Sequence, residues 1–456
     1  MRFLRCVVTA SVAAFVMASA GAHAASPSNM KEDYIKAPLP PGFQVIVTEL
    51  EGPVFANAQG LTLYKWPKKA NRNGDAGEIE YKPTCDSTIY RESSGLMSPY
   101  PPGLEMPEVD KRPSCVDVWP PVLASADAKE VGKWKPVDRP DGRKQWTYDG
   151  WSLYTSVLDK HPGETFGGSV MFWKFDGGVT RIPVSPEPNV PAQFGVVTTM
   201  MGRLVTLKTG WSVYTYDGDS RNKSNCYNAC LDGWQPVLAA DYARPAGEWA
   251  PFERAPGIRQ WAFRGKPVYR ALGDSKTHSQ DGSDNPRWHN VYTQVAPQLP
   301  QGLALKDTGS GLVLGDSKGS TIYQYVCIDD GIDQLACDNP NTPQIHRFTI
   351  CGGGDPDRCV KTFPYVVAPA GAKSGTTTWG TALINTKTGK WAKAGEADAL
   401  NVWTFRGRPV YTFAGRNGYG DKTAMDTNAQ NWGEFTGWRN GFQMMIYRDL
   451  FMMRDE

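Results

Sequence analysis

The motif that most resembles a catalytic site is a serine between two glycines. Residues 315 to 319 read Gly-Asp-Ser-Lys-Gly, the spacing of the nucleophile turn in α/β-hydrolases, where the serine follows a strand and precedes a helix. Here Ser317 precedes residues 321 to 325, which alternate as in a strand, and its counterpart in an internal repeat, residues 57 to 60, carries no hydroxyl. We therefore predict a turn at this point and assign no catalytic residue.

Histidines that could bind a metal or transfer protons are few. Outside the N-terminal leader they are His161, His278, His289 and His346. Neither Cys-x-x-Cys-His nor His-Glu-x-x-His occurs, so the sequence does not indicate covalent haem or a standard catalytic zinc. His161 and His278 fall in equivalent loops, where we expect solvated side chains and keep a metal shared by two loops as the alternative. We predict no metal and no cofactor.

His289 occupies a position that carries a basic or potentially basic residue in each copy of the repeat. Its counterparts are Lys174 and Arg439, and all three residues directly follow a tryptophan. This pattern suits a cation beside an aromatic ring or a carboxylate partner. We predict a structural role at a strand end, with ligand binding as the alternative.

Three pairs of adjacent methionines could supply the soft thioether ligands that Cu(I) prefers. The pairs are Met200-Met201, Met444-Met445 and Met452-Met453. No histidine accompanies them, so we expect core side chains. A role as an accessory of periplasmic redox or copper metabolism remains an alternative function.

Disulfides are predicted from the cysteines. Of the nine cysteines, Cys6 lies in the leader, and the other eight form an even set in a chain that we expect to be exported, which indicates four disulfides. Superposing the copies of the repeat gives the pairs Cys85 to Cys115, Cys226 to Cys230 and Cys351 to Cys359, and leaves Cys327 to Cys337.

The repeat that gives these pairings occurs three times. A segment with two tryptophans 12 residues apart, then an aromatic residue, a glycine and a tyrosine, begins at Trp134, Trp249 and Trp391. A shorter Gly-x-x-apolar-Tyr motif precedes each segment. Alternating aromatic residues around the Asp149-Gly150 dipeptide predict a two-residue hairpin turn, so each half-unit should be a hairpin. Helix is expected only in short stretches near the cysteines.

The aromatic residues divide into repeated and unrepeated ones. Trp134, Trp249 and Trp391 and their partners Trp146, Trp261 and Trp403 stand at fixed spacing, so we predict that they fill the cores. The unmatched Trp66, Trp211 and Trp432 are candidates for an exposed platform on which sugars or other flat ligands stack. Together with His289 they form the predicted binding surface.

The middle copy carries a family resemblance. Residues 210 to 219 read Gly-Trp-Ser-Val-Tyr-Thr-Tyr-Asp-Gly-Asp, and a Ser-Asn-Cys segment follows at 224 to 226. This pattern resembles a bacterial secreted repeat of the predicted lipoprotein type, with a Tyr-x-aromatic-x-x-Asp motif and unknown function. Asp159 and Asp274 keep the motif's acid elsewhere, whereas Lys69, Ile328 and Arg416 replace it. The resemblance implies export and fold more than activity.

The first 24 residues read as a secretory signal, with Arg2 and Arg5, an apolar run and an Ala-His-Ala cleavage site. Without these two arginines, 47 basic and 47 acidic residues remain, which gives no basic field for nucleic acid. No other long apolar stretch follows, so we expect no transmembrane segment after cleavage. We predict a periplasmic or secreted protein.

The expected fold class is all-β or β-rich, with three tandem disulfide-stapled small β domains, each made of two hairpin half-units. The predicted segments are a signal peptide (1–24), an extended leader (25–53), repeat domains (54–180 and 195–295) and a third repeat domain with a C-terminal tail (303–456). We predict a non-catalytic binding or scaffolding protein of the bacterial cell envelope, whose partner is an unknown envelope protein or polymer. Besides the copper or redox accessory, the alternative is an enzyme that acts on an envelope or extracellular polymer through carboxylates such as Asp219 and Asp274.

Overall fold

The structure is a computed structural model of the full chain. It describes residues 32–65, 83, 85–88, 113–168, 182–308, 311–325, 344, 347–348, 351, 355–414 and 442–448. Several predictions fall outside the described residues. They concern the signal peptide, Trp66, Trp432, His346, Met452-Met453 and the pair Cys327 and Cys337.

The described chain is β-rich, as predicted, and all its strand pairs are antiparallel. The first copy comprises β1 (Gln44–Thr48), β2 (Gly52–Ala56), β3 (Tyr64–Lys65), β4 (Leu123–Ala124), β5 (Trp134–Asp138), β6 (Lys144–Tyr148), β7 (Trp151–Ser152) and β8 (Ile182–Pro183). Its strands form the pairs β1-β2 and β3-β8 and the sheet β4-β6-β5, with β7 added on β6.

The second copy forms a three-stranded and a seven-stranded sheet. Its strands are β9 (Phe194–Thr199), β10 (Gly202–Leu207), β11 (Tyr214–Tyr216), β12 (Trp234–Pro236), β13 (Leu238–Ala239), β14 (Trp249–Ala255), β15 (Ile258–Phe263), β16 (Lys266–Ala271), β17 (Trp288–Asn290) and β18 (Tyr292–Val295). The third copy forms the sheets β19-β20-β26 and β22-β23-β24-β21-β25. Its strands are β19 (Leu303–Thr308), β20 (Gly311–Asp316), β21 (Tyr323–Tyr325), β22 (Trp379–Asn385), β23 (Ala399–Phe405), β24 (Arg408–Tyr411), β25 (Phe442–Met444) and β26 (Ile446–Arg448).

Four short helices lie wholly within the described residues, and three of these four contain a cysteine of a disulfide, as expected. They are α1 (Cys115–Val118), η3 (Asn228–Asp232), η4 (Asp281–Asp284) and α4 (Pro356–Thr362). Disulfides join Cys85 to Cys115, Cys226 to Cys230 and Cys351 to Cys359, the pairings that superposing the copies predicted.

The predicted two-residue hairpin turn occurs in all three copies. Asp149, Arg264 and Arg406 have positive φ angles of 50°, 50° and 47°, and each precedes a glycine that also has positive φ. Two consecutive residues of positive φ define the type I′ turn that matches the twist of a hairpin. The turns connect β6 to β7, β15 to β16 and β23 to β24.

The leader prediction does not hold for residues 44 to 53. They form β1, a turn and the start of β2, which pair from Gln44 opposite Ala56 to Thr48 opposite Gly52. This hairpin corresponds to β9-β10 and β19-β20, with which the other copies begin. The proline-rich sequence before it suggested an extended leader because the alternation over residues 44 to 48 is weak.

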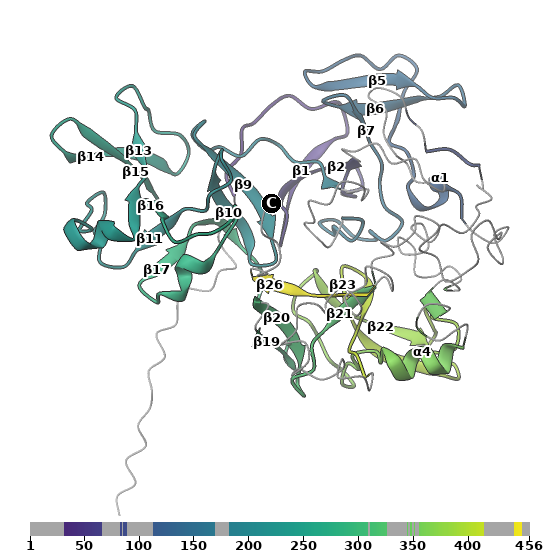
Figure 1. Cartoon of the computed structure of the whole chain (residues 1–456). Helices are drawn as coiled ribbons and strands as arrows, with labels where there is room; N and C mark the ends of the chain where they lie inside the picture. The colour runs from purple at the N-terminus through teal and green to yellow at the C-terminus, as the bar shows by residue number, and fades with distance from the viewer. Residues whose placement is uncertain are drawn as a thin grey trace, which may run out of the picture.

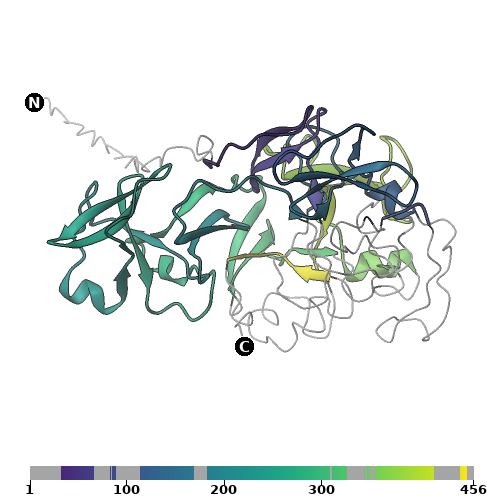
Figure 2. The same cartoon turned by 90° about the horizontal axis from the view of Figure 1, so that it is seen from above.

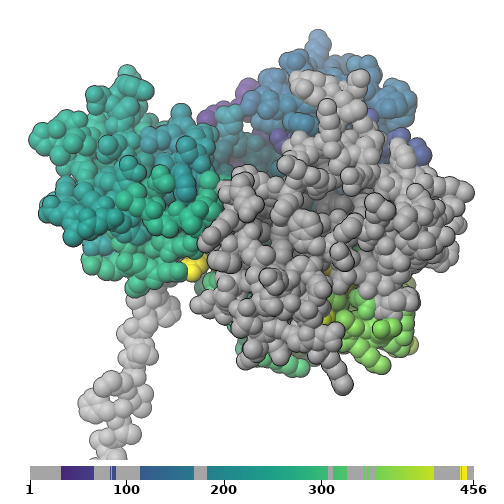
Figure 3. All heavy atoms as spheres, in the orientation of Figure 1, coloured from purple at the N-terminus to yellow at the C-terminus, as the bar shows by residue number. Residues whose placement is uncertain are grey.

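The copies lie around a common junction. Figure 1 shows the first copy in purple to blue, the second in teal and the third in green, and Figure 2 shows the teal copy lying beside the other two. On the face seen in Figure 3, the second copy forms a separate teal lobe. One core cluster nevertheless contains Leu50, Ala296 and Trp379, one residue from each copy. The copies are therefore joined by packing as well as by chain connections.

Trp391 was wrongly assigned to the core. In the sheets, Trp134 lies opposite Tyr148 and Trp249 opposite Phe263, and the residue in this position of the third copy is Trp379, opposite Phe405. Trp391 instead lies in the long connection between β22 and β23 and is 38% exposed, whereas Trp379 is 3% exposed. The matching spacing is a coincidence, because this connection is much longer than the two-residue one in the second copy.

Candidate functional site

The aspartates of the repeat motif are buried partners of tyrosines. In the second copy, the Tyr214 hydroxyl donates to the Asp274 carboxylate at 3.0 Å, and the Tyr269 hydroxyl donates to Asp219 at 2.7 Å. The acid that follows the tyrosine of one half-unit thus accepts from the tyrosine of the other half-unit. Burial raises the pKa of Asp219. The two carboxylates proposed for polymer cleavage are therefore engaged in cross-linking the half-units.

The first copy repeats one of these bonds. The Tyr64 hydroxyl donates to Asp159 at 2.7 Å, and the same carboxylate accepts the Phe166 N–H at 2.8 Å. Burial raises the pKa of Asp159 to about 7, against the lowering effect of the Tyr64 hydrogen bond. In the third copy, where Ile328 and Arg416 replace the acid, the buried Tyr323 hydroxyl has no partner within the described residues.

Asp159 should make stability depend on pH. Its pKa in the folded state is about 7, against 3.8 when unperturbed, so the protonated form stabilises the fold below about pH 4 and this contribution is lost as the pH rises through 7. We expect the free energy of unfolding of the wild type to fall by about 2–4 kcal/mol over this range relative to Asp159→Asn. Urea denaturation at several pH values measures this difference. Asp241→Asn, which changes an exposed carboxylate, is the control, and parallel pH profiles for the wild type and Asp159→Asn would contradict the prediction.

The predicted site residues that the structure describes are engaged with other side chains. The Arg270 guanidinium lies 4.1 Å from the ring centroid of Trp211 and covers one face of its indole. His289 is exposed, and its Nε2 lies 2.9 Å from Asp217 Oδ1, the carboxylate partner that the sequence suggested. Whether Trp211 and His289 bind a ligand stays a prediction.

The remaining chemical candidates have structural roles. Ser317 is exposed in the turn after β20, where the Asp316 carboxylate accepts the backbone N–H groups of Lys318 and Ser320, so the predicted turn is confirmed. Met444 and Met445 are buried in core clusters, as expected. Among the described residues, no three histidine, cysteine, aspartate or glutamate side chains lie close enough to hold a metal ion.

A cleft of about 430 Å³ lies between the first and third copies. The first copy contributes a loop, and the third contributes the start of β22, the loop before it, the exposed Trp391 and the turn after β23. The lining residues are Leu158, Lys160, Glu164, Phe166, Ser374, Thr376, Thr377, Trp379, Gly380, Thr381, Ala382, Trp391, Thr404 and Gly407. A concave site of this size that is shared by two units is a usual place for a ligand.

The walls of the cleft are fixed by contacts between the copies. The Glu49 carboxylate accepts the backbone N–H groups of Thr377 and Thr378 at 2.8 and 2.9 Å. Between the first and third copies, Arg408 donates to the Phe166 carbonyl, and the Phe166 ring packs on Gly407, where an added Cβ would lie 2.9 Å from the ring. The cleft is therefore preformed.

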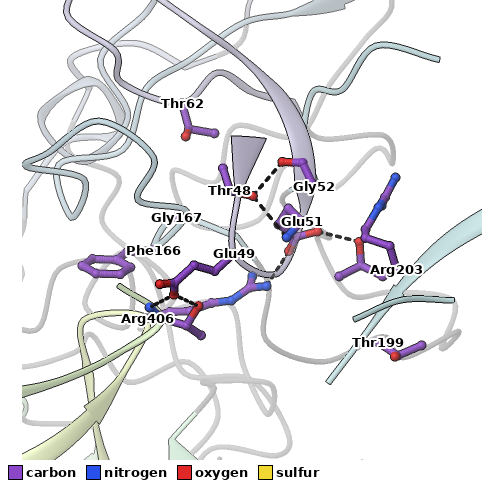
Figure 4. Close-up of polar contacts among 12 residues, drawn as sticks. Thr48, Glu49, Glu51, Gly52, Thr62, Phe166, Gly167, Thr199, Arg203 and Arg406 are labelled. Carbon is purple, nitrogen blue, oxygen red and sulfur yellow. Dashed lines mark hydrogen bonds and ion pairs between the residues drawn. The ribbon is translucent and has the colours of Figure 1, made fainter. Parts of the chain in front are cut away.

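A buried network of charges, which we name the junction network, includes Arg406, the residue before the lining residue Gly407. Figure 4 shows Glu51 on the β1-β2 turn, with Arg203 of the second copy on one side and Arg406 of the third on the other. Glu51 pairs with Arg406 and accepts the Thr198 hydroxyl at 2.6 Å. Arg203 in turn donates to the same Thr198 hydroxyl at 2.7 Å and to both carboxylate oxygens of Glu32. The network thus connects the N-terminal segment to two copies.

The class defined by these features is a β-rich, disulfide-linked repeat protein. Residues 135–172 and 195–238 match a family described as a secreted repeat of unknown function, which confirms the resemblance that the motifs suggested. No curated protein and no solved structure matches the chain significantly. The described residues contain no helix that is long and apolar enough to cross a membrane.

Proposed function

We propose that this protein is an exported, non-catalytic binding and scaffolding protein of the bacterial cell envelope, and that the cleft between its first and third copies is the binding site. The match to a secreted repeat supports export, and so do the three disulfides, because such bonds persist in oxidising compartments. The observation that carries the proposal is the cleft itself, which two copies build and interlocking contacts hold open.

Binding suits this cleft better than cleavage of a ligand. Glu164 is the one carboxylate among the lining residues, and it accepts the backbone N–H groups of Lys160 and His161, which fixes the conformation of its loop. Asp159, in the same loop, accepts hydrogen bonds from the Tyr64 hydroxyl and the Phe166 N–H. The acids near the cleft therefore fix the conformation of the loop that forms its wall. The other lining residues include serine and threonine hydroxyls and aromatic side chains.

Blocking the cleft should weaken binding to the envelope. Thr381 is exposed on β22, so Thr381→Arg should fill the cleft without disturbing the core. We expect wild-type protein to sediment with isolated cell-wall polymer and Thr381→Arg to bind on the order of tenfold more weakly. Tyr242→Arg, at an 87% exposed site in the second copy, is the matched control. Equal sedimentation of both variants would place the binding site elsewhere, and release of soluble fragments from the polymer would contradict the non-catalytic role.

A further inference from the structure

Trp391 is an exposed aromatic residue in the lining of the cleft. It is 38% exposed, and no aromatic ring or cation stacks on it within the described residues. Two other exposed or half-exposed aromatics are covered: Arg270 lies over Trp211, and Arg254 lies 4.3 Å from the ring centroid of Tyr227. An indole with a free face provides a large apolar plane at low entropic cost and can stack on a flat ligand surface.

Polar groups border the indole along the edge strand β22. The Trp379 N–H donates to the Thr376 hydroxyl at 3.0 Å, and the Leu383 carbonyl accepts the Ala392 N–H at 2.8 Å, so both residues turn their backbone groups away from β23. Since this orientation alternates along a strand, Thr381, which lies between them, turns its N–H and C=O to the same side. Thr381 therefore offers a backbone donor, a backbone acceptor and a hydroxyl beside the cleft.

The lining carries little net charge. Lys160 and Glu164 are its ionisable residues, one of each sign, and the Glu164 carboxylate is occupied by its own loop. The other polar groups are hydroxyls of serine and threonine, which both donate and accept hydrogen bonds. Such a surface complements a neutral ligand that is itself rich in hydroxyls, because a polyanion would find no cluster of positive charge here.

We propose that the cleft binds an uncharged saccharide chain, with the apolar face of one sugar ring on Trp391 and the hydroxyls of the chain bonded to Thr381 and the other lining threonines. This inference rests on the proposed function and names its ligand class. The indole of Trp391 suits the apolar face of a sugar ring, and ring hydroxyls can bond to the lining hydroxyls, which both donate and accept.

Calorimetric titration of the full chain with linear neutral oligosaccharides of glucose and of N-acetylglucosamine tests the inference. We expect saturable binding by the wild type, a loss on the order of tenfold in Trp391→Ala and a smaller loss in Trp391→Phe, which keeps an aromatic face. Tyr242→Ala, which removes an exposed aromatic side chain from the second copy, should bind as the wild type does. Because Trp391 is 38% exposed and Trp379 only 3%, the melting temperature should fall less in Trp391→Ala than in Trp379→Ala.

Two results would overturn the inference and leave the proposed function standing. One is cell-wall binding that Thr381→Arg weakens but Trp391→Ala does not alter. The other is titration in which an uncharged extended peptide binds and the saccharides do not, since β22 would then be taking an added strand. If the wild type sediments with no envelope polymer and binds no saccharide, both proposals fail.

Discussion

Replacing Glu51 by glutamine is expected to lower the free energy of unfolding by about 3–5 kcal/mol, the usual cost of removing one member of a buried ion pair. The Arg406 side chain is 1% exposed, so the variant would leave its guanidinium buried without the charge of Glu51. Burial opposes ionisation of Glu51, and Arg406, Thr198 and Arg203 outweigh it, so the pKa of Glu51 lies below its ordinary value. The stabilisation is therefore present at neutral pH and is lost as the pH falls through that lowered pKa.

Glu187→Gln provides the matched control for this experiment. Glu187 pairs with Lys133 at 2.7 Å, but the two side chains are 61% and 47% exposed. A surface pair of this kind contributes about 0–1 kcal/mol. Urea denaturation at neutral pH compares the two variants, and a similar small loss in both would show that the junction network does not hold the copies together.

The same experiment reports on cooperativity between the copies. Glu51 contacts the second copy through Thr198 and the third through Arg406, and Leu50 beside it lies in a core cluster with residues of both. We expect the wild type to unfold in fewer steps than three separate domains would, and Glu51→Gln to separate the transitions. The measured slope against urea, which scales with the surface exposed in each step, would reveal this separation.

The sequence could predict the features that form within a single copy. Hairpin turns, disulfide pairs and short helices depend on neighbouring residues or on equivalent positions, so Asp149-Gly150 and Cys226 with Cys230 were sufficient signals. The hydrogen bonds between tyrosines and aspartates could also have been predicted. The acid after Tyr214 and the acid after Tyr269 recur at matching places, and a reciprocal exchange between half-units is the simplest symmetric pairing.

The junction network could not be predicted from the repeat. Arg406 stands where the first copy has Asp149, and the β1-β2 turn that carries Glu51 corresponds to Met200-Met201 in the second copy. The contacts of these residues are specific to one copy: the second copy has Arg264 at the position of Arg406, but Arg264 pairs with Glu248 and not with Glu51. A comparison of the copies with one another overlooks such contacts. It therefore also overlooks the cleft that lies between the first and third copies.

Trp391 illustrates the opposite error, in which a similarity between copies is accidental. Its spacing to Trp403 equals that of Trp249 to Trp261, yet the sheet register places Trp379 opposite Phe405. The longer connection between β22 and β23 happens to place a tryptophan 12 residues before Trp403. That tryptophan does not occupy the strand position that Trp249 has in the second copy. Counting along a sequence cannot separate these cases when an insertion happens to have a matching length, whereas strand pairing separates them at once.

Substituting alanine for these tryptophans tests the register directly. Trp249 is 1% exposed and stacks on Phe194 with ring centroids 4.1 Å apart, and Trp379 is 3% exposed against Phe405. We expect Trp249→Ala and Trp379→Ala each to cost about 3–5 kcal/mol through lost burial and the cavity left behind. Trp391→Ala should cost clearly less than either, because 38% of this residue is exposed. Denaturation in urea measures all three, and a loss at Trp391 as large as that at Trp249 would restore the spacing-based alignment and remove Trp391 as a free binding surface.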